Sequence, residues 1–159
     1  MGRESLKTAL TLTLLLAALV RPACSAELAL FSGITEATVQ RVVDGDTVVL
    51  HGGERVRFIG VDAPETGEPG AAEASEFVRR LIEGETVWLE ADGADRERFA
   101  RLRRYVWLRP PTDTGDEEQI RRYQLNALLL SAGHARVMII GSPRNAELFR
   151  RIEAEAGSP

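Results

Sequence analysis

The segments VVDGDTVV (residues 42–49) and RFIGVDAPET (residues 57–66) decide how we interpret this chain. Each begins as an apolar run typical of a β-strand and ends in a polar turn. Together they place four carboxylates and one guanidinium within 22 residues: Asp44, Asp46, Arg57, Asp62 and Glu65. A packed core rarely needs several acids at the ends of neighbouring strands, whereas a divalent cation beside a phosphate ester does. The sequence therefore predicts a metal-dependent phosphodiesterase site.

Apolar runs and turn residues predict a small barrel around these segments. Five strands are expected, at residues 37–43, 47–51, 54–61, 85–91 and 101–108. Amphipathic patterns predict three helices, at residues 71–83, 119–132 and 142–156. In the last helix, Ser142 is the expected N-cap and Pro143 the first helical residue. This order predicts an α+β, mainly β fold: a five-stranded oligonucleotide-binding (OB) barrel capped by about three helices.

The first 26 residues are typical of a secretory signal peptide. Basic residues precede a 12-residue apolar run (residues 9–20), and small residues allow cleavage after Ala26. The run is short for a permanent membrane span, so an uncleaved anchor is the weaker alternative. We expect a lead-in at residues 27–36 and one domain at residues 37–159. The mature protein would be secreted or periplasmic, without stable membrane association.

Composition limits the class of protein. Cys24 is the only cysteine and lies in the predicted signal peptide, which excludes thiol catalysis and a zinc–cysteine site. Without residues 1–26 the chain has 17 basic and 23 acidic residues, a net charge of −6, unlike a general nucleic-acid coat protein. The charge is uneven, because residues 96–109 hold six arginines and only one acid, Glu97. Such a stretch suits contact with phosphate.

Asp46 and Asp62 are the candidate metal ligands. Asp46 leaves the first hairpin turn and Asp62 leaves the third strand, so pairing of those strands would bring both carboxylates to one end of the barrel. Oxygen ligands without a neighbouring histidine favour calcium or magnesium over zinc. Calcium suits a secreted protein, because weak extracellular sites bind it at roughly millimolar concentration. Taken alone, the DGDT segment is more typical of an ordinary Asx turn.

Arg57 and Glu65 supply the remaining chemistry of the predicted site. A guanidinium on the strand before Asp62 suits a phosphate oxygen and the charge that develops in the transition state. A second arginine from residues 96–104 would complete this clamp. Glu65 lies on the loop after Asp62, where its carboxylate either activates an attacking water or caps the following helix.

Three motifs in this order resemble the staphylococcal nuclease (thermonuclease) family. They are VDGDT at residues 43–47, RFIGVDAPE at residues 57–65, and Arg101 leading into Tyr105. The resemblance covers about residues 37–156. It implies a calcium-dependent endo- or exonuclease that hydrolyses DNA or RNA. We expect a single-stranded or flexible nucleic acid as the substrate and a monomer as the active form.

The resemblance also implies roles for individual residues. The calcium ligands would be Asp46, Asp62 and the backbone carbonyl of Ala63. The residues that support these ligands would be Asp44 and Thr47. The residues that act on water and phosphate would be Glu65, Arg57 and Arg101.

The chain departs from the family pattern near the second arginine. The family usually has Tyr-Gly where this chain has Phe99 and Ala100, which leaves three alternatives to Arg101: Arg98, Arg103 and Arg104.

Two further positions, Ile139 and Gly141, stand where related nucleases carry tyrosines beside the bound base. We expect substrate contacts from Arg98 and from Phe99 or Trp107 instead, because stacking contributes about 1–3 kcal/mol per base. The alternative to an enzyme is a non-catalytic OB-fold module that binds single-stranded nucleic acid or another partner.

Overall fold

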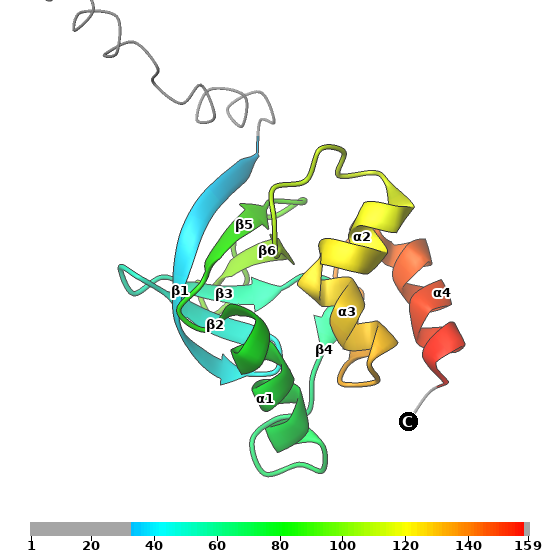
Figure 1. The fold of residues 1–159 in the computed structure, drawn as a ribbon, viewed down its shortest axis with the longest axis horizontal. Helices are drawn as coiled ribbons and strands as arrows, with labels where there is room; N and C mark the ends of the chain where they lie inside the picture. Colours follow the sequence, from blue (N-terminus) through cyan, green and yellow to red (C-terminus); the bar gives the residue numbers. More distant parts are fainter. Residues whose placement is uncertain (1–32, 158–159) are drawn as a thin grey trace, which may run out of the picture. The chain divides into compact units, whose positions relative to one another are not determined.

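Five strands close into a barrel in the computed structural model, which describes residues 33–157 (Figure 1). They are β1 (Ile34–Asp44), β2 (Thr47–Leu50), β3 (Arg55–Phe58), β5 (Thr86–Glu90) and β6 (Leu102–Trp107), in the order β1-β2-β3-β6-β5. Neighbouring strands are antiparallel except β3 and β6, which are parallel. The predicted five-stranded OB-type barrel is confirmed. The predicted signal peptide lies outside the described residues.

The register of the strands follows the alternation of apolar side chains. Val48 and Val56 face each other across β2 and β3, and both are completely buried. On β5, Val87 and Leu89 face the core, a choice that the sequence pattern leaves open. Strand β1 begins at Ile34, earlier than predicted, because its first residues pair with β5.

The predicted third strand is split at Gly60. Strand β3 ends before it, and β4 (Val61–Asp62) pairs instead with β7 (Arg136–Val137) in a separate two-stranded sheet. Gly60 has a φ of 78°, and a Cβ there would lie 2.8 Å from the Phe149 ring, so only glycine allows this turn. The split places the predicted metal ligand Asp62 on β4, outside the barrel sheet.

Four helices occur where about three are predicted: α1 (Ala71–Ile82), α2 (Glu117–Tyr123), α3 (Leu125–Ser131) and α4 (Ala146–Ala156). The predicted second helix is divided because Gln124 is extended (ψ 115°) and forms a β-bridge with Trp107. The predicted start of the last helix is wrong. Its N-cap is Asn145, and the preceding backbone N–H of Arg144 donates to Asp92 Oδ2 (2.8 Å). No helix within residues 33–157 is long and apolar enough to cross a membrane.

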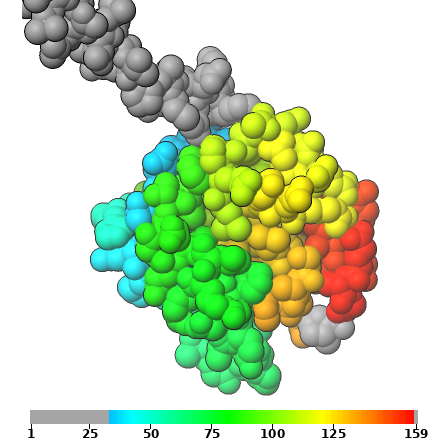
Figure 2. All heavy atoms as spheres, viewed as in Figure 1, coloured from blue at the N-terminus to red at the C-terminus, as the bar shows by residue number. Residues whose placement is uncertain are grey.

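Small residues let α1 approach the turn between β1 and β2. A Cβ on Gly45 would lie 2.6 Å from the Ala63 Cβ and 2.8 Å from the Ala74 Cβ. Three segments therefore touch at one point: this turn, the chain after β4, and α1. Figure 2 shows the side chains of α1 packed beside those of α3 and the chain that follows it. Phe77 of α1 lies against His134 there, with ring centroids 4.8 Å apart.

Candidate active site

A cleft of about 730 Å³ collects the predicted site residues. Nine of the ten line it: Asp44, Asp46, Arg57, Asp62, Ala63, Glu65, Arg98, Phe99 and Arg101. The tenth, Thr47, is fully buried beside Asp46. Three stretches therefore meet in one place: residues 42–49, residues 57–66 and the arginine-rich residues 96–109.

Asp46 is the most constrained carboxylate of the cleft. Its side chain is 1% exposed. Its Oδ2 accepts a hydrogen bond from the Ala63 N–H (2.7 Å), and its Oδ1 accepts one from Thr47 Oγ1 (3.0 Å). Its own backbone N–H donates to Asp44 Oδ1 (3.0 Å). Asp44 and Thr47 thus fix the position of Asp46, as the resemblance implies.

Arg57 bridges the two predicted metal ligands. Its Nη1 forms an ion pair with Asp46 Oδ1, and its Nη2 lies 2.6 Å from Asp62 Oδ1. Both carboxylates therefore contact one guanidinium. Within residues 33–157, no cluster of three or more Asp, Glu, His or Cys side chains could hold a metal. The donor set fits a weakly held, hard divalent cation whose shell is completed by backbone or water oxygens.

Arg101 lies immediately before β6 and reaches Thr47, beside Asp46. Its Nη1 donates to Thr47 Oγ1 (3.3 Å), and this hydroxyl in turn donates to Asp46. Of the alternatives, Arg104 does not line the cleft and pairs with Asp95 (2.5 Å). Arg98 and Arg103 line the cleft without contacting Thr47 or the acids near it. The geometry therefore favours Arg101 as the second arginine.

Glu97 holds Arg101 and is not among the predicted site residues. Its Oε1 accepts a hydrogen bond from Arg101 Nε (2.9 Å). The hydrogen bond from Arg101 is the main reason that the pKa of Glu97 is lowered from its ordinary value. The signal in the sequence is a single acid four residues before Arg101 in an otherwise basic stretch.

Glu65 lies on the exposed loop after β4, and its side chain lines the cleft. Its backbone N–H donates to Glu68 Oε2 (2.8 Å), and the Glu68 N–H donates back to its carbonyl (2.9 Å). The alternative role as a helix cap is wrong, because α1 has Gly70 as its N-cap and no side-chain cap. Glu68, which supports the loop, is a second residue that the sequence argument does not identify.

Comparison with known proteins identifies the family. A family model described as "Staphylococcal nuclease homologue" matches residues 55–158. The chain belongs to the staphylococcal nuclease family. It is 39% identical over 79 residues to the thermonucleases of Staphylococcus hyicus and Staphylococcus intermedius. Each match covers 44% of this chain and 47% of the relative, about half of that protein's length. The predicted resemblance is confirmed.

The two aromatic residues expected to contact a base lie in different surroundings. Trp107 is fully buried, and its Nε1 donates to Glu90 Oε2 (2.8 Å), so its proposed role beside a base is wrong. Phe99 is 63% exposed and lines the cleft. The guanidinium carbon of Arg98 lies 4.6 Å from the centre of its ring. Phe99 is therefore an exposed aromatic ring of the cleft.

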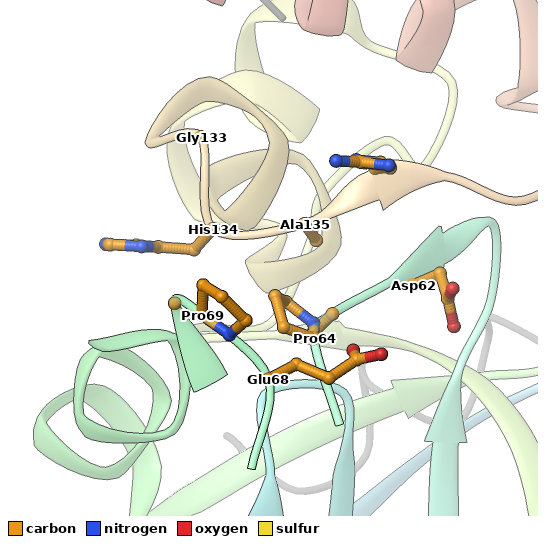
Figure 3. A pocket seen from close by; sticks show the side chains of 10 residues that line it. Asp62, Pro64, Glu68, Pro69, Gly133, His134 and Ala135 are labelled. Carbon is orange, nitrogen blue, oxygen red and sulfur yellow. The ribbon is translucent and has the colours of Figure 1, made fainter. Parts of the chain in front are cut away.

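A second pocket of about 420 Å³ shares Asp62 and Ala63 with the cleft. Figure 3 shows Pro64, Glu68 and Pro69 on one of its walls, and His134 on another. Asp62 and His134 lie at opposite ends of this pocket, so the histidine does not join the acidic cluster.

Proposed function

We propose that this chain is a secreted, calcium-dependent nuclease that hydrolyses phosphodiester bonds of DNA or RNA. The observation that carries the proposal is the convergence of Asp46 and Asp62 on one cationic group in a cleft that Arg101 and Glu65 also line. Membership of the staphylococcal nuclease family and similarity to two thermonucleases support the same reaction.

Different side chains of the cleft have different roles in hydrolysis. Asp46, Asp62 and the Ala63 carbonyl would hold calcium, which would supply positive charge to the phosphate. Arg57 and Arg101 donate hydrogen bonds to phosphate oxygens and stabilise the negative charge that grows on them in the transition state. Glu65 accepts a proton from the attacking water, which displaces the leaving oxygen in line.

Glu68 and Glu97 position other residues of the cleft and take no part in the reaction itself. Glu68 accepts a hydrogen bond from the backbone N–H of Glu65, and Glu97 holds Arg101 through its Nε. Because Glu97 binds the same guanidinium that the phosphate needs, the substrate competes with Glu97 for Arg101.

The direct test is calcium-dependent release of nucleotides. Purified protein is expected to release acid-soluble nucleotides from denatured DNA at roughly millimolar calcium and to stop when calcium is chelated. Binding of denatured DNA without any release would instead support the non-catalytic binding module. Light scattering tests the expected monomer. Recovery of a chain that begins at residue 27 from the periplasm or medium tests secretion.

Glu65→Gln tests the water-activating role. This change removes the proton acceptor and keeps the size of the side chain, so kcat should fall about 100-fold or more while calcium-dependent binding of an oligonucleotide persists. Glu73→Gln on the exposed face of α1 is the matched control and should leave kcat unchanged. An unchanged kcat in Glu65→Gln would assign the proton transfer to another group.

A further inference from the structure

Arg103 is a cleft residue that the proposed reaction does not use. It lies on β6 directly across from Arg57 of the parallel strand β3. Arg101 lies two residues earlier, immediately before β6. All three arginines line the same cleft.

The partners of Arg103 differ from those of its neighbours. Arg57, Arg101 and Arg104 each pair with a carboxylate. Within residues 33–157, no carboxylate oxygen lies within 4.0 Å of the Arg103 guanidinium. Its Nη2 donates instead to the Ile140 carbonyl (3.0 Å). This bond holds the group in place and leaves most of its N–H donors for a ligand.

The cleft that holds this guanidinium also has exposed apolar side chains. Phe99 (63% exposed) and Ile140 (56% exposed) are the two large hydrophobic side chains that stand out as exposed in the described part of the chain. Both line the cleft, and the carbonyl of Ile140 accepts the bond from Arg103. A phenyl ring in such a cleft is a stacking platform for a nucleobase. A phosphate alone would gain nothing from apolar neighbours, so their presence favours a base as the ligand of Arg103.

We propose that Arg103 is a specificity-determining residue that makes the cleft prefer guanine. A guanidinium fork matches the paired O6 and N7 acceptors of guanine, whereas adenine and cytosine present an amino donor there. The inference rests on the proposed nuclease function, because it names the base next to the phosphate that the cleft would cleave.

The test uses the full chain with calcium and seven-nucleotide thymidine oligonucleotides that carry one different central base. The central base is guanine, inosine, 7-deazaguanine or adenine. Cleavage beside that base is measured with the active protein, and equilibrium binding is measured by fluorescence anisotropy with Glu65→Gln. Guanine and inosine, which both keep O6 and N7, should be bound and cut about 10-fold better than the other two.

Two variants test whether Arg103 recognises the base or only supports the fold. Arg103→Lys keeps the charge and a donor for the Ile140 carbonyl but loses the fork, so it should remove the preference with an unchanged melting temperature. Arg122→Lys on the exposed surface of α2 is the matched control and should keep the preference.

The outcomes distinguish this inference from the nuclease function. Equal cleavage and equal binding of guanine and 7-deazaguanine would overturn the role of Arg103 while the nuclease function stands. A guanine preference in binding without any cleavage would support Arg103 and overturn the nuclease function. A preference that survives in Arg103→Lys would also overturn the assignment.

Discussion

Ala100 is held in a backbone conformation that favours glycine. Its φ is 61°, and it is the one non-glycine residue with a positive φ in the described part of the chain. It closes the turn that precedes Arg101, where its N–H donates to the Glu97 carbonyl (2.9 Å). Glycine at this position would avoid the strain, which is about 1–2 kcal/mol.

Ala100→Gly is therefore expected to stabilise the protein. Relief of the strain exceeds the greater freedom of glycine in the unfolded chain, so the free energy of unfolding should rise by up to about 1 kcal/mol in urea titrations. Ala72→Gly in α1, where φ is ordinary, should lower it by about 0.5–1 kcal/mol. A loss of stability in Ala100→Gly would show that the turn does not strain Ala100.

Glu97 makes the stability of the site loop dependent on pH. Because Arg101 lowers its pKa, the ionised Glu97 stabilises the fold at neutral pH, and this contribution is lost as the pH falls through the lowered pKa. Glu97→Gln should lower the free energy of unfolding by less than about 1 kcal/mol near pH 7, because the pair is partly exposed to solvent.

Urea titrations across the acid range measure this effect. The difference in the free energy of unfolding between Glu97→Gln and the parent protein should vanish in acid. Glu73→Gln is the control, and its difference from the parent should not shrink in acid. A difference that is constant with pH would contradict a charge-based role for Glu97.

At the scale of elements, Asn126 of α3 joins helix and barrel. Its Oδ1 accepts from the Val106 N–H (2.9 Å) on β6, and its Nδ2 donates to the Ile59 carbonyl (2.8 Å) where β3 has ended. The side chain is fully buried. The split between β3 and β4 leaves these backbone groups without strand partners. Asn126 supplies their hydrogen bonds instead.

Asn126→Ala should lower the free energy of unfolding by roughly 2–4 kcal/mol, because two buried backbone groups lose their partners. Thermal and urea unfolding measure the loss. Ser131→Ala, on the exposed end of the same helix, should change it by less than about 0.5 kcal/mol. A loss below about 1 kcal/mol in Asn126→Ala would mean that water replaces the amide.

The division between α2 and α3 is a feature that the hydrophobic periodicity of the sequence does not predict. Apolar residues continue at helical spacing through residues 119–132, so the pattern predicts one helix. Gln124 leaves the helical conformation because it bridges Trp107, and Leu108 N–H donates to the Tyr123 carbonyl (2.9 Å). These partners lie at the end of β6 and just after it, and no local pattern encodes them.

For the whole molecule, calcium binding should be coupled to folding. Asp46 and Asp62 meet only in the folded chain, so calcium stabilises the native state over the unfolded state. At calcium concentrations 10 to 100 times the Kd, the gain is roughly 1.4–2.7 kcal/mol, and calorimetry should show a Tm higher by several degrees.

Asp62→Asn should abolish this calcium-dependent shift. Asp113→Asn, an exposed acid before α2 that does not line the cleft, should retain it. The same shift in Asp62→Asn as in the parent would place calcium elsewhere on the protein.

Local patterns in the sequence predict the barrel and most of the side chains that we expect in its cleft. Strand alternation and turn residues are local properties, so the short turn at residues 44–46 and the apolar faces of β2 and β3 follow from neighbouring residues. Pairing of β2 with β3 brings Arg57 beside Asp46, whereas Asp62 reaches the same place from β4, outside the barrel sheet.

Tertiary structure alone decided the remaining features. It split the third strand at Gly60, where Phe149 leaves no room for a Cβ. It placed Arg101 against Thr47, turned Arg104 to Asp95, and buried Trp107 with Glu90. In each case the deciding partner comes from packing that brings separate segments of the chain together, which residue spacing does not specify.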